Sequence, residues 1–174
     1  MTLKDLLTTY WSQVTLILLA FSYLIKRILD IKSKKTEVNH SLFQQNRIMA
    51  VKTFFSRYAK AELMWHQLAI FDVLNHKLTT KEMDQIIFLQ LNELQETLFE
   101  LKIYFDDDCH KYFEQLTKGI RAINDKLIDL YFNSNPEINT TNKANDYYFF
   151  KEEILNKNRE IMDALCLKIK DIFK

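Results

Sequence analysis

Residues 6–25, LLTTYWSQVTLILLAFSYLI, contain no charged side chain. As an α-helix with a rise of about 1.5 Å per residue, this stretch is about 30 Å long, which matches the hydrocarbon thickness of a bilayer. Tyr10 and Trp11 lie near one end, where amphipathic rings favour the headgroup layer, and Lys26 and Arg27 follow the other end. We therefore expect residues 1–30 to form an amino-terminal transmembrane anchor. A buried amphipathic helix of a soluble protein is the alternative, because hydroxyl and amide side chains interrupt the run.

Flanking charge predicts the orientation of this anchor. Only Lys4, beside Asp5, precedes the stretch, whereas five basic residues follow it closely: Lys26, Arg27, Lys32, Lys34 and Lys35. Because Lys and Arg near a span stay on the cytoplasmic side, we expect the amino terminus outside and the rest of the chain in the cytoplasm. No A-x-A-like cleavage site follows the apolar run, which argues against a cleaved signal peptide. A composition rich in Lys, Asn, Ile and Phe is typical of an AT-rich bacterium, so the predicted location is single-pass in the bacterial inner (plasma) membrane.

The remainder of the chain has the pattern of an all-α domain. One Gly and one Pro among 174 residues leave little material for tight turns and sheet corners. Apolar side chains recur at helical spacing over residues 41–76, 79–104, 106–132 and 146–172, and residues 133–136, NSNP, are a strong breaker before a polar loop at 136–145. Thr79 and Glu82 fit a capping box. We expect a cytosolic bundle of about four helices over residues 31–174. Residues 32–40 are expected to be a solvated helical stalk, with a hinge as the alternative.

Enzyme signatures are missing from the sequence. There is no P-loop, GxGxxG or nucleophile elbow, so we predict no enzyme, no catalytic residue and no cofactor. Asp106, Asp107, Asp108 and His110 form the one dense group of metal-ligand types, but they match no EF-hand loop, and we expect a helix cap there instead of a metal site. Residues 147–150, YYFF, are expected to pack in the core, with partner or base stacking as the alternative.

Charge is distributed unevenly along the chain. Residues 26–60 contain nine basic and two acidic side chains, a balance of +7, whereas residues 61–174 contain 14 basic and 20 acidic ones, a balance of −6. We call the nine basic residues the basic collar. It could contact anionic lipid headgroups, dock a nucleotide or oligonucleotide, or simply be solvated. Its members are Lys26, Arg27, Lys32, Lys34, Lys35, Arg47, Lys52, Arg57 and Lys60.

Small hydroxyl residues form a stripe along the apolar segment. Their spacing of four, three and seven places them on one side of a helix, with Leu19 in the vacant slot. Such stripes serve as helix contacts within membranes, and they would also suit the wall of a narrow pore. Alternatively, each hydroxyl bonds a backbone carbonyl of its own helix. The stripe consists of Thr8, Ser12, Thr15, Leu19 and Ser22.

In overall plan, a short amino-terminal span followed by a helical cytosolic domain, the chain resembles small membrane effectors of bacterial anti-phage defence. The Hailong type, a tetrameric membrane channel held in check by a nucleotide oligomer, has a similar plan. The resemblance implies a homo-oligomeric membrane effector or ion channel with a cytosolic sensing domain, and a nucleotide ligand at the basic collar. It covers the plan alone, so it assigns no residue a role. The alternative function is a membrane-tethered adaptor whose helical body binds a cytosolic protein.

Overall fold

The computed structural model describes residues 2–132 and 139–173, and over these residues it is all-α. The bounds of its helices are α1 Leu3–Gln67, α2 Ile70–Leu74, α3 Thr80–Tyr104, α4 Asp107–Phe132 and α5 Thr140–Ile172. The all-α class and the helical bundle predicted from the sequence are confirmed. The predicted breaker at 133–136 lies outside the described residues.

The chain divides into two compact units, Met1–Asn46 and Arg47–Lys174, and α1 contributes to both. The first unit is helical from Leu3 onwards, so the predicted stalk at residues 32–40 is confirmed as helix. The domain boundary expected at residue 30 stays a prediction.

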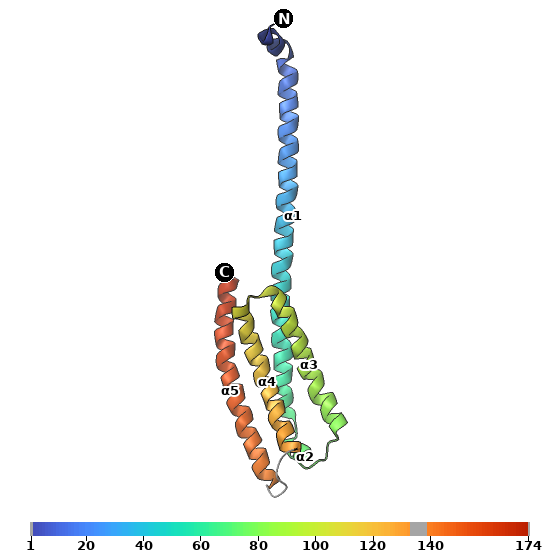
Figure 1. Cartoon of the computed structure of the whole chain (residues 1–174), viewed down its shortest axis with the longest axis vertical. Coiled ribbons are helices and arrows are strands. Elements are labelled where there is room, and N and C mark those ends of the chain that lie inside the picture. Colours follow the sequence, from blue (N-terminus) through green and yellow to red (C-terminus); the bar gives the residue numbers. More distant parts are fainter. Residues whose placement is uncertain (1, 133–138, 174) are drawn as a thin grey trace. The chain divides into compact units, whose positions relative to one another are not determined.

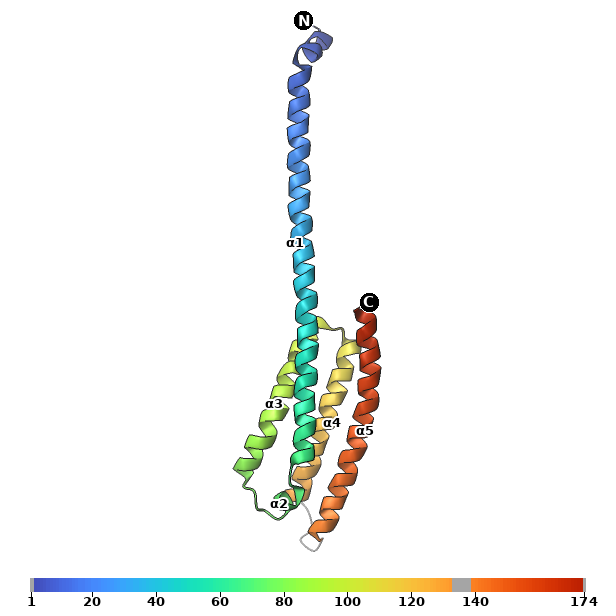
Figure 2. The same ribbon diagram turned by 180° about the vertical axis from the view of Figure 1, so that it is seen from behind.

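The second unit is the helical bundle. Its part of α1 lies beside α3, α4 and α5, and the short α2 lies at the end of the bundle where α1 ends (Figures 1 and 2). The core includes the wholly buried Trp65, and Phe54 of α1 meets Phe113 of α4 edge to face with 4.9 Å between ring centroids. The apolar face expected in the helix at 106–132 is buried from Phe113 to Leu127, and Tyr131, its last member, is half-buried.

The helix predicted over residues 41–76 ends earlier, at Gln67, and a separate α2 follows. Leu68, directly after α1, is buried in line with Trp65, and an uninterrupted helix would next turn Asp72 and His76 towards the core. The break at Ala69 instead allows three apolar residues of α2 to be buried, and the burial of their apolar area outweighs the cost of interrupting the helix. These residues are Ile70, Val73 and Leu74.

Two predicted helix caps are confirmed. At the start of α3, the Thr79 hydroxyl accepts from the Glu82 amide at 3.2 Å, and the Glu82 carboxylate accepts from the Thr79 amide at 2.9 Å. These hydrogen bonds lower the pKa of Glu82. At the start of α4, the Asp106 carboxylate accepts from the Cys109 amide at 2.8 Å. Both caps satisfy amides that the first turn of a helix leaves unpaired.

Helix α5 begins at Thr140, so the loop predicted over residues 136–145 is wrong for 140–145. Asn139 caps the helix by accepting a hydrogen bond from the Thr141 amide at 3.0 Å. The early start also places Ala144 on the same buried face as Tyr147 and Leu155. The cap at Asn139 and the burial of Ala144 together extend the helix over residues 140–145, although this sequence is polar and has no apolar periodicity.

Candidate functional site in α1

The apolar segment of α1 exposes large side chains on every side of the helix. Leu16, Ile17, Leu18 and Leu19 are consecutive, so steps of about 100° carry them around the whole circumference. Each of the four is 57–67% exposed, and Trp11 is exposed as well. A helix that is apolar all round is normally surrounded by protein or lipid. Among the described residues of its own unit, no second helix covers this segment.

Among the described residues, no helix reaches both the length and the mean hydropathy that crossing a membrane requires.

Two members of the predicted hydroxyl stripe bond their own helix. The Thr8 hydroxyl donates to the Lys4 carbonyl at 2.9 Å, and the Thr15 hydroxyl donates to the Trp11 carbonyl at 2.8 Å. Leu19 and Ser22 are exposed, and the side chain of Ser12 lies outside the described part. The roles predicted for this stripe, helix contact or pore wall, stay predictions.

The basic collar spans both units. In the first unit, the five members from Lys26 to Lys35 are all exposed. In the second unit, Lys52 and Lys60 are exposed, whereas Arg57 forms an ion pair with Glu93 of α3. Apart from Arg47, the part of the collar in the bundle therefore offers two exposed lysines and one arginine that is already paired.

Arg47, the remaining member of the collar, packs against aromatic rings. Its guanidinium carbon lies 4.4 Å from the ring centroid of Phe105 and 5.3 Å from that of Phe173. Its Nε is buried and has no hydrogen-bond partner among the described residues. Cation–π contact of this kind holds an arginine in place. Sequence reasoning missed it, because both rings lie more than 50 positions away.

The four aromatic residues at 147–150 lie on different faces of α5, so some are buried and others are exposed. Tyr147 is wholly buried, whereas Phe149 is 74% exposed. Burial raises the pKa of the Tyr147 hydroxyl, which has no hydrogen-bond partner among the described residues. Core packing is therefore confirmed for Tyr147, and Phe149 is left on the surface. In the described part of the chain, no three His, Cys, Asp or Glu side chains are placed to hold a metal ion.

A polar junction in the bundle was missed by the sequence analysis. Asn158 of α5 is buried, and its Nδ2 donates to the Tyr58 hydroxyl at 3.0 Å and to the Leu116 carbonyl at 3.2 Å. Burial raises the pKa of Tyr58 to about 12, although the hydrogen bond from Asn158 acts in the opposite direction. Helical spacing in the sequence could have predicted that Asn158 is buried, because it lies three positions after Leu155 and seven before Leu165 on the same face of α5.

No family model matches this chain, and neither a curated protein nor a solved structure matches it.

Proposed function

We propose that this protein is a self-associating membrane effector of the bacterial inner membrane. In this proposal the apolar segment of α1 enters lipid with the amino terminus outside, and the bundle of residues 47–174 is a cytoplasmic recognition module. The observation that carries the proposal is the full turn of exposed apolar side chains from Leu16 to Leu19. Leaving them in water is unfavourable by roughly 1.5–3 kcal/mol for each side chain that could instead be buried.

Self-association explains the polar residues of the same segment. Gln13, Thr15 and Ser22 make it less apolar than an isolated span needs, and contacts between copies would remove them from lipid. The hydroxyls of Thr8 and Thr15 already donate to backbone carbonyls, so lipid or a neighbouring helix can cover them at little cost. Channel activity and a role in anti-phage defence, which the resemblance implies, are the further part of this proposal.

Membrane attachment is tested with a matched pair of substitutions in α1. Leu18→Arg places a charge in the apolar segment, where insertion would cost roughly 2.5–3.5 kcal/mol. Val38→Arg makes the same change at an exposed position of the predicted stalk. We expect the wild-type chain and the Val38→Arg variant to resist alkaline carbonate extraction of bacterial membranes, and a large part of the Leu18→Arg variant to be released. Release of the wild-type chain would refute the proposal.

Self-association and conduction are measured separately. The mass of the detergent-solubilised chain should exceed that of a monomer. If the assembly conducts, liposomes that contain it will pass ions, and the double substitution Ser12→Leu and Thr15→Leu will abolish the current. A multimer that passes no ions would support the self-associating membrane effector and refute channel activity. A monomer that stays in the membrane would refute self-association and support membrane attachment alone.

The adaptor function remains a second candidate because of the outer face of α3. Leu89, Phe99 and Ile103 are exposed there, and helical spacing places them on one side together with Glu96 and Glu100. A photo-reactive residue at position 99 should then form one defined adduct with a cytosolic protein in cells. The same residue at the exposed Lys157 of α5 is the control. Adducts only with other copies of this chain would favour the self-associating effector.

A further inference from the structure

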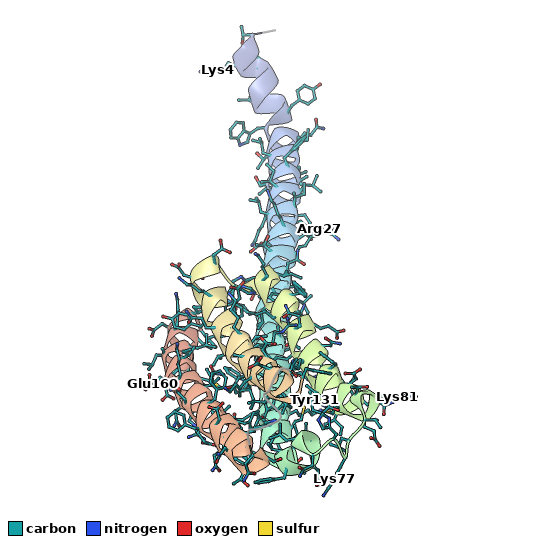
Figure 3. All side chains as sticks on the ribbon, turned by 60° about the horizontal axis from the view of Figure 1, so that its bottom comes forward. Lys4, Arg27, Lys77, Lys81, Tyr131 and Glu160 are labelled. Atoms are coloured by element: carbon teal, nitrogen blue, oxygen red, sulfur yellow. The ribbon has the colours of Figure 1, made fainter. Side chains whose placement is uncertain are left out.

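A cleft of about 280 Å³ opens between the amino-terminal part of α3 and the carboxy-terminal part of α4. Its walls are mainly apolar, with Met83, Ile87 and Phe88 on α3 and Leu127, Ile128 and Tyr131 on α4. This volume is close to the lower limit of about 300 Å³ for pockets that hold drug-sized ligands, so a fitting ligand is small. Figure 3 looks towards this end of the bundle and labels Tyr131, near the end of α4, and Lys81, near the start of α3.

Two polar side chains line the cleft without a partner among the described residues. Asn124 of α4 is only 6% exposed, and its side chain lines the cleft without a hydrogen bond to another described residue. Its amide atoms are open to the cleft, so they can pair with a ligand or with water that enters it. Asp84 of α3 is exposed, and its carboxylate forms no ion pair with any described residue. The cleft thus combines an amide that lacks a partner with a negative charge.

The walls of the cleft are held in place by contacts with neighbouring residues. The ring of Tyr131 lies 4.4 Å from that of His76, centroid to centroid. His76, two residues after α2, has a φ of 56°, in the left-handed region. The capping box of Thr79 and Glu82 fixes the start of α3, next to Thr80 at the edge of the cleft. A site whose walls are fixed before binding loses less entropy on binding.

We infer that this cleft binds a small cationic amphiphile. An aromatic or branched apolar body fits between Ile87 and Leu127, a hydrogen-bonding group pairs with the Asn124 amide, and an ammonium group faces Asp84. The charge is opposite to that of the nucleotide expected at the basic collar, so the two sites would take different ligands. The inference concerns the bundle alone and does not depend on membrane attachment.

Three probes with one ring and different charges test this inference: tryptamine, indole and indole-3-acetate. The readout is the methyl NMR spectrum of the full chain in detergent, at one detergent concentration. We expect saturable shifts at Met83, Ile87 and Ile128, and none at Ile103, which is 71% exposed near the other end of α3. Tryptamine should bind most tightly and indole-3-acetate most weakly. An exposed ion pair accounts for a preference of up to about fivefold of tryptamine over indole.

Three variants make the result decisive. Asp84→Asn should remove the preference for tryptamine over indole and leave indole binding unchanged. Ile128→Trp, at the edge of the cleft, should abolish the shifts at Met83 and Ile87, whereas the same change at Ile103 should preserve them. The inference is overturned if no probe gives saturable shifts at millimolar concentration, if indole-3-acetate binds best, or if a folded Ile128→Trp variant binds normally. Asp84→Asn retaining the full preference for tryptamine would also overturn it.

Discussion

At the scale of single residues, Asn158 joins three helices. Its amide nitrogen is shared between the Tyr58 hydroxyl of α1 and the Leu116 carbonyl of α4. The side chain lies so close to Gly119 that a Cβ added there would be 2.3 Å from the Asn158 Oδ1. Because that distance is far below van der Waals contact, Gly119 is required by the approach of Asn158 and not by its own backbone conformation.

Gly119→Ala is therefore expected to destabilise the bundle. Alanine in a helix interior is favoured over glycine by about 1 kcal/mol, but overpacking at a filled site costs about 1–3 kcal/mol and the displaced Asn158 loses buried hydrogen bonds. Urea unfolding in mild detergent measures the difference. In the Asn158→Ala background the same substitution should become neutral or stabilising. Additive effects of the two changes would show that the two residues do not interact.

Tyr58 predicts a loss of stability at high pH. Its pKa is about 12 in the folded protein, whereas the ordinary value for tyrosine is 10.0. Because the folded state holds this proton more tightly, the stabilisation is complete below about pH 10 and is lost as the pH rises towards 12. Tyr58→Phe should be less stable at pH 8 by about 1–3 kcal/mol, because Asn158 loses an acceptor.

The measurement is the free energy of unfolding as a function of pH between 8 and 11.5. We expect a shallower fall above pH 10 for Tyr58→Phe than for the wild type, with the remaining fall partly due to Tyr147, whose pKa burial also raises. Identical slopes for the two chains would contradict the assignment to Tyr58.

At the scale of helices, the contribution of the α4 cap to stability can be measured by comparing substitutions of Asp106 and of the adjacent Asp107. Asp106→Ala removes the acceptor of the Cys109 amide and should destabilise the protein by about 1 kcal/mol. Asp107→Ala is the control, because Asp107 lies in the first turn and acts only through the helix dipole, worth roughly 0.3–1 kcal/mol. Equal losses of thermal stability would mean that charge, and not the capping hydrogen bond, stabilises this end.

Helix positions were predictable where the determinants are local. The capping box at Thr79 and the buried face of α4 follow from residues within a few positions of each other, and both are confirmed. The break at Ala69 and the early start of α5 depend on what packs against α2 and Ala144 in the folded bundle. Lys151 is a further case that depends on tertiary packing. It is buried on α5, and its Nζ lies 5.2 Å from the ring centroid of Tyr148.

At the scale of the whole molecule, the charge of the basic collar leads us to predict binding to anionic lipid. Lys34→Gln with Lys35→Gln should weaken binding to mixed micelles that contain phosphatidylserine by roughly 30-fold, since each charge near an anionic surface contributes about 1 kcal/mol. The pair Lys111→Gln and Lys157→Gln, exposed in the bundle, is the control. If lipid binding is unchanged and oligonucleotide binding is lost, the collar is a ligand site instead.

The candidate site was predictable in part. Composition and spacing located the apolar segment and the basic residues, since those are properties of the sequence itself. The engagement of Arg57 by Glu93 and of Arg47 by Phe105 is set by packing between distant positions. Sequence alone therefore overstated how much of the collar is available to a ligand. The cleft beside Asn124 could not be predicted either, because its two walls come from separate helices.

The two tryptophans give each unit its own optical signal. Trp65 is wholly buried in the bundle, whereas Trp11 is exposed in the apolar segment. In Trp11→Phe protein, the emission maximum should lie in the blue and shift to the red only when the bundle unfolds. In Trp65→Phe protein, the emission should respond to brominated lipids, which quench indole fluorescence at short range. The native chain thus carries separate fluorescent reporters of folding and of lipid contact, without an attached dye.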